Sequence, residues 1–184
     1  MAEQLMETTL RTALWQQFGA AIDMLENALL ACPSMHWNGL LWSDPQAPAY
    51  PTFWSITYHT LFWLEAYLSG SLEDYAPPAP FALDEGDRAA TRAEPYTKEQ
   101  LRGWLAAMRQ QARTTLTALT DEQARQPFVF PWRPGHPISY LALQLYNMRH
   151  AQEHAAHLSL MLGQHGLPPA DLDWVSYAGE QSGG

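Results

Sequence analysis

The stretch LQLYNMRHAQEHAAHLSLM, residues 143–161, contains the most informative pattern in the chain. His150 and His154 stand four positions apart, and this spacing brings two helical side chains onto one face with Cβ atoms roughly 5–6 Å apart. At 100° per residue, apolar residues lie on the same line above and below them: Leu143, Tyr146, His150, His154, His157 and Met161. We therefore expect this line to face a protein interior, where the two imidazoles could share one metal ion.

Four segments of helical length lie between groups of prolines, which collect outside helix interiors because proline lacks a backbone donor. Thr97 to Gln100 matches a capping box at the start of the third segment. The second segment is apolar nearly all round and stops at Gly70, which is typical of a buried helix with a left-handed cap. We predict an all-α, up-and-down four-helix bundle forming one domain over residues 1–184, with helices at residues 4–31, 51–69, 97–119 and 137–164.

The first and third segments also predict which side chains fill the core. Apolar residues recur there at three- and four-residue steps, from Leu10 to Leu29 and from Leu101 to Leu119. The side chains expected to be buried are Leu14, Phe18, Ile22, Trp104, Leu105 and Met108.

Composition excludes several classes of function. The formal net charge of -9 repels phosphate backbones, so nucleic acid is not an expected partner. Cys32 is the only cysteine, which excludes an internal disulfide, and we find neither a signal-peptide pattern nor an apolar run long enough to span a membrane. We expect a soluble cytoplasmic protein. Only 16% of residues are charged and eight are Trp, so a homodimer covering some apolar surface is expected.

His59 is the candidate third ligand, because it lies mid-helix on an apolar face and is the only histidine of the second segment. Histidines four apart are common on solvated faces, and a lone buried histidine is more often a hydrogen-bonded core residue than a ligand. Three imidazoles stacked in a core would compete for hydrogen-bond partners, and a metal ion removes that need. The combination of one interior histidine with a stacked pair favours a metal site in a bundle core.

These residues resemble the DinB/YfiT-like superfamily. The interior histidine of the second helix is followed near the end of the chain by HAQEHAAHL, residues 150–158, which is similar to the family's histidine, three residues, histidine pattern. The resemblance covers essentially the whole chain. It implies that His59, His150 and His154 are ligands of one divalent metal ion. His157 stands where many relatives carry Gln. It is either a fourth ligand or a residue that contacts the ligands without binding the metal.

The resemblance also implies an activity. Relatives with assigned activities are thiol S-transferases using bacillithiol-like or mycothiol-like cofactors, and a mycothiol-dependent maleylpyruvate isomerase; the family name implies no DNA binding. Three neutral imidazoles leave a divalent ion its charge and an open position, where a thiol loses its proton near neutral pH. The candidate function is thus transfer of a low-molecular-weight thiol, or water in a hydrolase, onto a small electrophilic substrate.

Two alternatives remain open at this point. A non-enzymatic metal-binding or stress-associated domain would follow from a closed four-ligand site, and a metal-free helical interaction module would follow if the histidines did not converge. Zinc is the expected metal, followed by nickel. Glu65 and Glu153 are candidates for a general base, while His136 and His165 adjoin proline or glycine and are expected outside the core.

Overall fold

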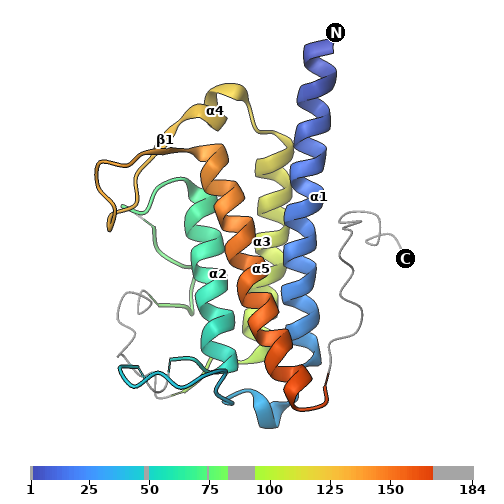
Figure 1. Ribbon diagram of the computed structural model, residues 1–184, viewed down its shortest axis with the longest axis vertical. Coiled ribbons are helices and arrows are strands. Elements are labelled where there is room, and N and C mark those ends of the chain that lie inside the picture. The colour runs from blue at the N-terminus through green and yellow to red at the C-terminus, as the bar shows by residue number, and fades with distance from the viewer. Residues whose placement is uncertain (1, 48–49, 74, 83–93, 168–184) are drawn as a thin grey trace.

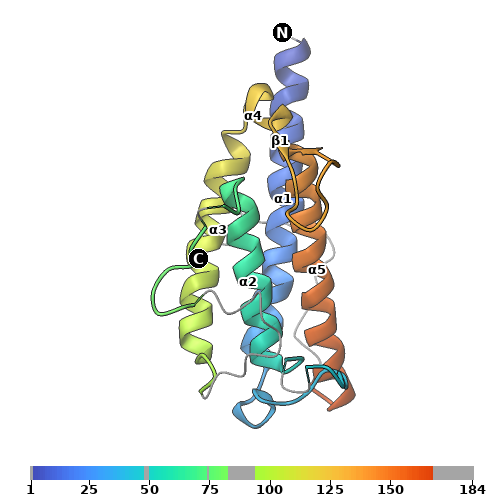
Figure 2. The same cartoon turned by 90° about the vertical axis from the view of Figure 1, so that its left-hand side faces the viewer.

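The computed structural model describes residues 2–47, 50–73, 75–82 and 94–167. Figures 1 and 2 show four long helices side by side: α1 (Ala2–Ala31), α2 (Phe53–Ser69), α3 (Lys98–Thr117) and α5 (Tyr140–Gln164). The shorter elements are the 3-10 helix η1 (Ser34–His36), helix α4 (Asp121–Arg125), and an antiparallel pair of two-residue strands, β1 (Pro127–Phe128) and β2 (Ile138–Ser139). The predicted all-α class is confirmed.

The order of helix directions departs from strict up-and-down alternation. Helices α1 and α2 each pack against both α3 and α5. In Figure 1, α1 and α5 run from top to bottom, whereas α2 and α3 run from bottom to top. Parallel neighbours need a connection that returns along the bundle. The connection over residues 70–97 is long enough to do so, because α2, with 17 residues, measures only about 25 Å.

The caps predicted from the sequence are present. The Thr97 side chain accepts a hydrogen bond from the backbone N–H of Gln100, and the Gln100 side chain accepts one from the backbone N–H of Thr97. Gly70 ends α2 in the left-handed conformation, with a φ of 75°. A residue with a Cβ is strained in this conformation, so glycine permits the helix to stop here.

Helices α2, α3 and α5 begin later than predicted because a side chain caps each of them, and Thr97 is the cap of α3, which begins at Lys98 rather than at residue 97. Thr52 forms a capping box with Ser55, so α2 begins at Phe53 rather than at residue 51. Ser139 accepts a hydrogen bond from the backbone N–H of Ala142, and its own segment pairs with β1, so α5 begins at residue 140 rather than 137.

The core lies between the four long helices. Leu10, the first residue of the predicted stripe on α1, is however 56% exposed. Its neighbour Arg11 donates a hydrogen bond from Nη1 to the carbonyl of Leu119, just past the end of α3. The Arg11 contact places this part of α1 level with the end of α3, and α1 extends beyond that end of the bundle (Figure 1). All six side chains predicted to be buried are buried: Leu14, Phe18, Ile22, Trp104, Leu105 and Met108.

No helix in the part of the chain that the structure describes combines the length and the apolar character needed to cross a membrane.

Candidate metal centre

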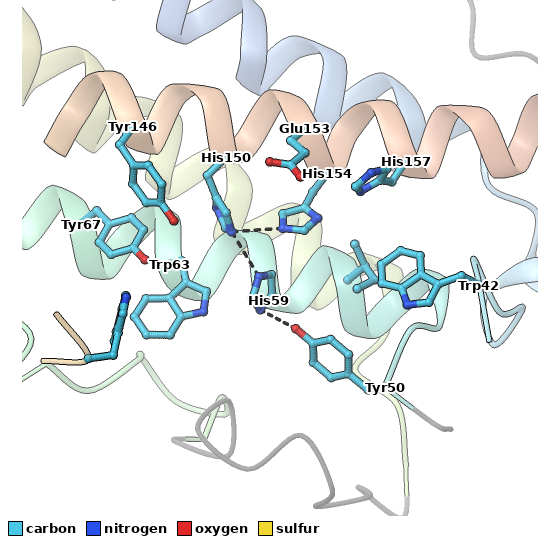
Figure 3. Close-up of a pocket in the computed structure, with 12 residues that line it drawn as sticks. Trp42, Tyr50, His59, Trp63, Tyr67, Tyr146, His150, Glu153, His154 and His157 are labelled. Atoms are coloured by element: carbon cyan, nitrogen blue, oxygen red, sulfur yellow. Dashed lines mark hydrogen bonds between the residues drawn. The ribbon is translucent and has the colours of Figure 1, made fainter. Parts of the chain in front are cut away.

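The three predicted histidines come together between two neighbouring helices. His59 lies on α2, and His150 and His154 lie one turn apart on α5. Figure 3 shows the three rings pointing toward one another across the gap between the helices. Nε2 of His150 lies 3.1 Å from Nε2 of His59 and 3.1 Å from Nε2 of His154. One nitrogen of each ring lies within 4.8 Å of the others, so the group could hold a metal ion.

The environment of His150 suits a metal ligand. Burial, and next the nearby His59, lower the pKa of His150 to about 3, so this imidazole is neutral at pH 7. A histidine must be neutral to coordinate a metal. Its Nδ1 is buried without a hydrogen-bond partner among the described residues, so the ring makes its polar contacts through Nε2. Three nitrogen donors around one point are a set that zinc and similar ions prefer.

Tyr50 contacts the His59 ring on the side away from His150. This residue lies in the connection between η1 and α2, and its phenol oxygen is 2.7 Å from Nδ1 of His59. When Nε2 of His59 carries no proton, as coordination requires, Nδ1–H donates to the phenol oxygen. The Ser55 hydroxyl donates to the backbone carbonyl of Tyr50, which ties the connection to the first turn of α2. The ring orientation of His59 is therefore fixed by the chain that precedes its helix.

Buried amides set the register between α2 and α5. Gln144 donates from Nε2 to the carbonyl of Tyr67 at 2.7 Å, and Asn147 donates from Nδ2 to the carbonyl of Leu64 at 3.1 Å. Both side chains are completely buried. Asn147 precedes His150 by about one turn, so these bonds decide which part of α2 the histidine pair faces. Sequence reasoning missed both amides, although their positions on the inner face of α5 are visible in the helical periodicity.

The histidine group opens into a pocket of about 570 Å³. Aromatic side chains from both helices and from two connections form most of its wall. Trp42 comes from the connection before α2, and Trp132 from the connection between β1 and β2. The lining residues are Trp42, Tyr50, Ile56, His59, Trp63, Tyr67, Trp132, Tyr146, His150, Glu153, His154 and His157. The sequence pattern did not identify Trp42 and Trp132 as the residues of these connections that reach the site.

The remaining candidates divide between the pocket and the rest of the molecule. His157 lines the pocket, with its ring centroid 5.6 Å from that of His154, but it is not part of the three-histidine group. Glu153 also lines the pocket. Glu65 does not: its Oε2 accepts hydrogen bonds from the Tyr75 hydroxyl and from Trp104 Nε1, each at 2.9 Å. The carboxylate of Glu65 therefore faces α3 rather than the pocket, and it cannot act as a base there.

His136 and His165 are both exposed and neither lines the pocket, as expected. Because the three histidines converge, the condition for a metal-free interaction module is not met.

Comparison with curated proteins and with solved structures finds no match. A family model described as the DinB superfamily matches residues 12–158, a range that includes His59, His150 and His154. The matched segment begins in α1 and ends in α5, so it covers all four long helices. The chain belongs to the DinB superfamily.

Proposed function

We propose that the protein binds one divalent metal ion through His59, His150 and His154. The supporting observation is the meeting of three imidazole nitrogens within 4.8 Å of one another at the wall of a pocket. His150 is neutral at pH 7, and the group includes no carboxylate or thiolate. Zinc fits this nitrogen donor set best, and nickel is the second candidate.

We further propose that the protein is a metal-dependent enzyme that transfers a low-molecular-weight thiol, or less readily water, onto a small electrophile. A bound divalent ion would lower the pKa of a thiol or water beside it. A pocket of about 570 Å³ is large enough for a small substrate, and a three-histidine group leaves one side of the site open toward it. A closed site with four protein ligands would instead favour the non-enzymatic alternative.

The side chains around the site have separate roles in this proposal. Tyr50 orients His59, and the aromatic wall bounds the pocket in which the substrate would bind. Glu153 is the one carboxylate among the described lining residues, so we assign it as the acceptor of the proton that the nucleophile loses.

Elemental analysis tests the metal site. The protein is purified without a metal-affinity column, and we expect about one divalent ion per chain. His154→Ala should lose the ion, whereas His136→Ala should keep it, because His136 is exposed and outside the pocket. A wild-type protein without stoichiometric metal, or a His136→Ala variant that loses metal while His154→Ala retains it, would show that the ligand assignment is wrong.

Enzyme assays separate the two functional candidates. The zinc-loaded protein is incubated with a small thiol and an electrophilic aryl or alkyl halide, and loss of free thiol is followed. Metal-dependent turnover that Glu153→Gln reduces would support the transferase. A protein that holds stoichiometric zinc but does not accelerate thiol transfer or hydrolysis would favour the non-enzymatic domain.

A further inference from the structure

The pocket extends to both sides of the histidine group. In Figure 3, Trp63, Tyr67 and Tyr146 lie on one side of the histidines, and Trp42 and His157 lie on the other. Trp132 belongs to the first side, because its ring centroid is 5.5 Å from that of Trp63. We call the first side the aromatic lobe and define it by Trp63, Tyr67, Trp132 and Tyr146.

The rings of the aromatic lobe form a corner. The indoles of Trp63 and Trp132 are almost perpendicular, with an interplanar angle of 84°. Trp63 is backed by Tyr67, with ring centroids 5.3 Å apart and planes at 25°. A flat ring placed in such a corner stacks on one indole and meets the other edge-on, and these are the two arrangements that aromatic pairs prefer.

The solvent exposure of Trp132 is unusual for so large an apolar side chain. It is 59% exposed, although Phe130 packs against it with ring centroids 5.1 Å apart. Phe130 in turn contacts Tyr146, with centroids 5.5 Å apart, so the connection that carries Trp132 is attached to α5. An indole that is held in place and still exposed at the wall of a pocket can gain further burial when a ligand binds.

The charges on the pocket wall restrict the charge that the ligand can carry. No Lys or Arg occurs among the lining residues that the structure describes, and Glu153 is their only carboxylate. An anionic group in the aromatic lobe would lose its hydration without gaining a cationic side chain as a partner.

We propose that the aromatic lobe is the subsite for the electrophilic substrate, and that it takes an uncharged molecule with a planar aromatic ring. The reaction at this subsite rests on the proposed function, because a substrate ring bound in the lobe would place a reactive substituent beside the histidine group. Binding of the substrate ring depends only on the lobe, in which Trp132 and Trp63 determine the specificity for an aromatic ring.

Calorimetric titration of the full chain with two small alcohols and one carboxylate tests the assignment. The probes are 2-naphthylmethanol, its fully saturated decalin counterpart, and 2-naphthoate. Titrations use metal-free protein, so that the carboxylate of naphthoate cannot bind a metal, and are repeated with zinc-loaded protein. We expect 2-naphthylmethanol to bind metal-free protein roughly two- to tenfold more tightly than either other probe.

Two tryptophan variants form a matched pair, because both residues are exposed, both line the pocket, and they lie on opposite sides of the histidines. Trp132→Leu should weaken binding of 2-naphthylmethanol by roughly two- to tenfold, and Trp42→Leu should change it by less than about twofold. Equal binding of the aromatic and saturated alcohols would overturn the proposal. Tighter binding of naphthoate, or a larger loss in Trp42→Leu, would also overturn it.

The lobe and the metal site can fail separately in this design. Binding to metal-free protein reports the aromatic lobe alone, whereas metal stoichiometry reports the three histidines. If the naphthyl alcohol binds selectively but the protein does not take up stoichiometric metal, the subsite is supported and the metal site is contradicted. If the protein takes up stoichiometric metal but does not bind the naphthyl alcohol selectively, only the subsite is contradicted.

Discussion

The phenol oxygen of Tyr50 lies 2.7 Å from Nδ1 of His59, on the opposite side of the ring from the Nε2 that faces His150. This contact connects a residue before α2 to a candidate ligand in the middle of α2. It orients the ring, and in the tautomer in which Nε2 is free to coordinate, Nδ1–H donates to the phenol oxygen, as a group behind a metal-binding histidine usually accepts.

Removal of this hydroxyl should weaken metal binding with little effect on folding. We expect Tyr50→Phe to lower zinc affinity roughly 10- to 100-fold, measured by competition with a chromophoric chelator. Tyr75→Phe is the matched control, because it removes a hydroxyl that donates to Glu65, away from the histidine group. Similar zinc affinities for both variants would mean that the Tyr50 contact does not support the site.

The stability of the metal-free protein should depend on pH through His150. Its pKa is lowered from 6.5 to about 3 in the folded chain, so between these values the unfolded chain holds a proton that the folded chain does not. The free energy of unfolding should therefore fall as pH drops from about 6.5 toward 3, by at most about 1.4 kcal/mol per pH unit from this group. Urea titrations in the presence of a chelator measure this slope.

His150→Gln isolates the contribution of His150, because glutamine does not titrate. We expect a shallower dependence of stability on pH in this variant across the same range. A slope equal to that of the wild-type protein would show that the imidazole of His150 is not protected from protonation by folding.

The amide of Asn147 should contribute both to stability and to the metal site. Asn147→Leu keeps a similar volume but removes the hydrogen bond to the carbonyl of Leu64, and we expect a loss of about 1–3 kcal/mol in the free energy of unfolding. Zinc affinity should fall as well, because the register of α5 against α2 is less firmly fixed. Chemical denaturation and chelator competition measure the two effects.

Ser159→Ala is the control for Asn147→Leu. Ser159 is another buried polar residue of α5, but its hydroxyl has no hydrogen-bond partner among the described residues. We expect the change to leave stability within about 0.5 kcal/mol of the wild-type value or slightly above it. A loss as large as that of Asn147→Leu would indicate that burial of a polar group, rather than its bond across the helices, determines the effect.

Two glycines should respond to alanine in opposite directions. Gly70 has a φ of 75°, and a Cβ there would lie 3.1 Å from Cε2 of Tyr140, so Gly70→Ala should cost about 1–2 kcal/mol. Gly103 lies within α3 with nothing within 4 Å of a Cβ, so Gly103→Ala should stabilise the protein by about 0.5–1 kcal/mol. Thermal denaturation measures both changes. A Gly70→Ala midpoint at or above the wild-type value would contradict the role of Gly70 as the left-handed cap, and a lowered Gly103→Ala midpoint would contradict the prediction for Gly103.

Local patterns in the sequence determined the helices and one half of the candidate site. The periodic stripes of α1 and α3 predicted buried residues such as Phe18 and Leu105, because a helix presents every third or fourth residue to the same side. His150 and His154 share a face for the same reason, whatever the rest of the chain does. The exposure of Leu10 shows where this reasoning stops, since periodicity does not tell where the neighbouring helices end.

Only the tertiary structure decided which residues meet across the helices. His59 reaches the histidine pair because bonds such as that from Asn147 to Leu64 fix how far α2 and α5 slide past each other. Trp132 joins the pocket through packing between a connection and α5, and no sequence spacing encodes such a contact. Glu65 is turned toward α3 by Trp104. Contacts between distant segments depend on the packing of the whole core, so they could not be derived from the order of residues along any one helix.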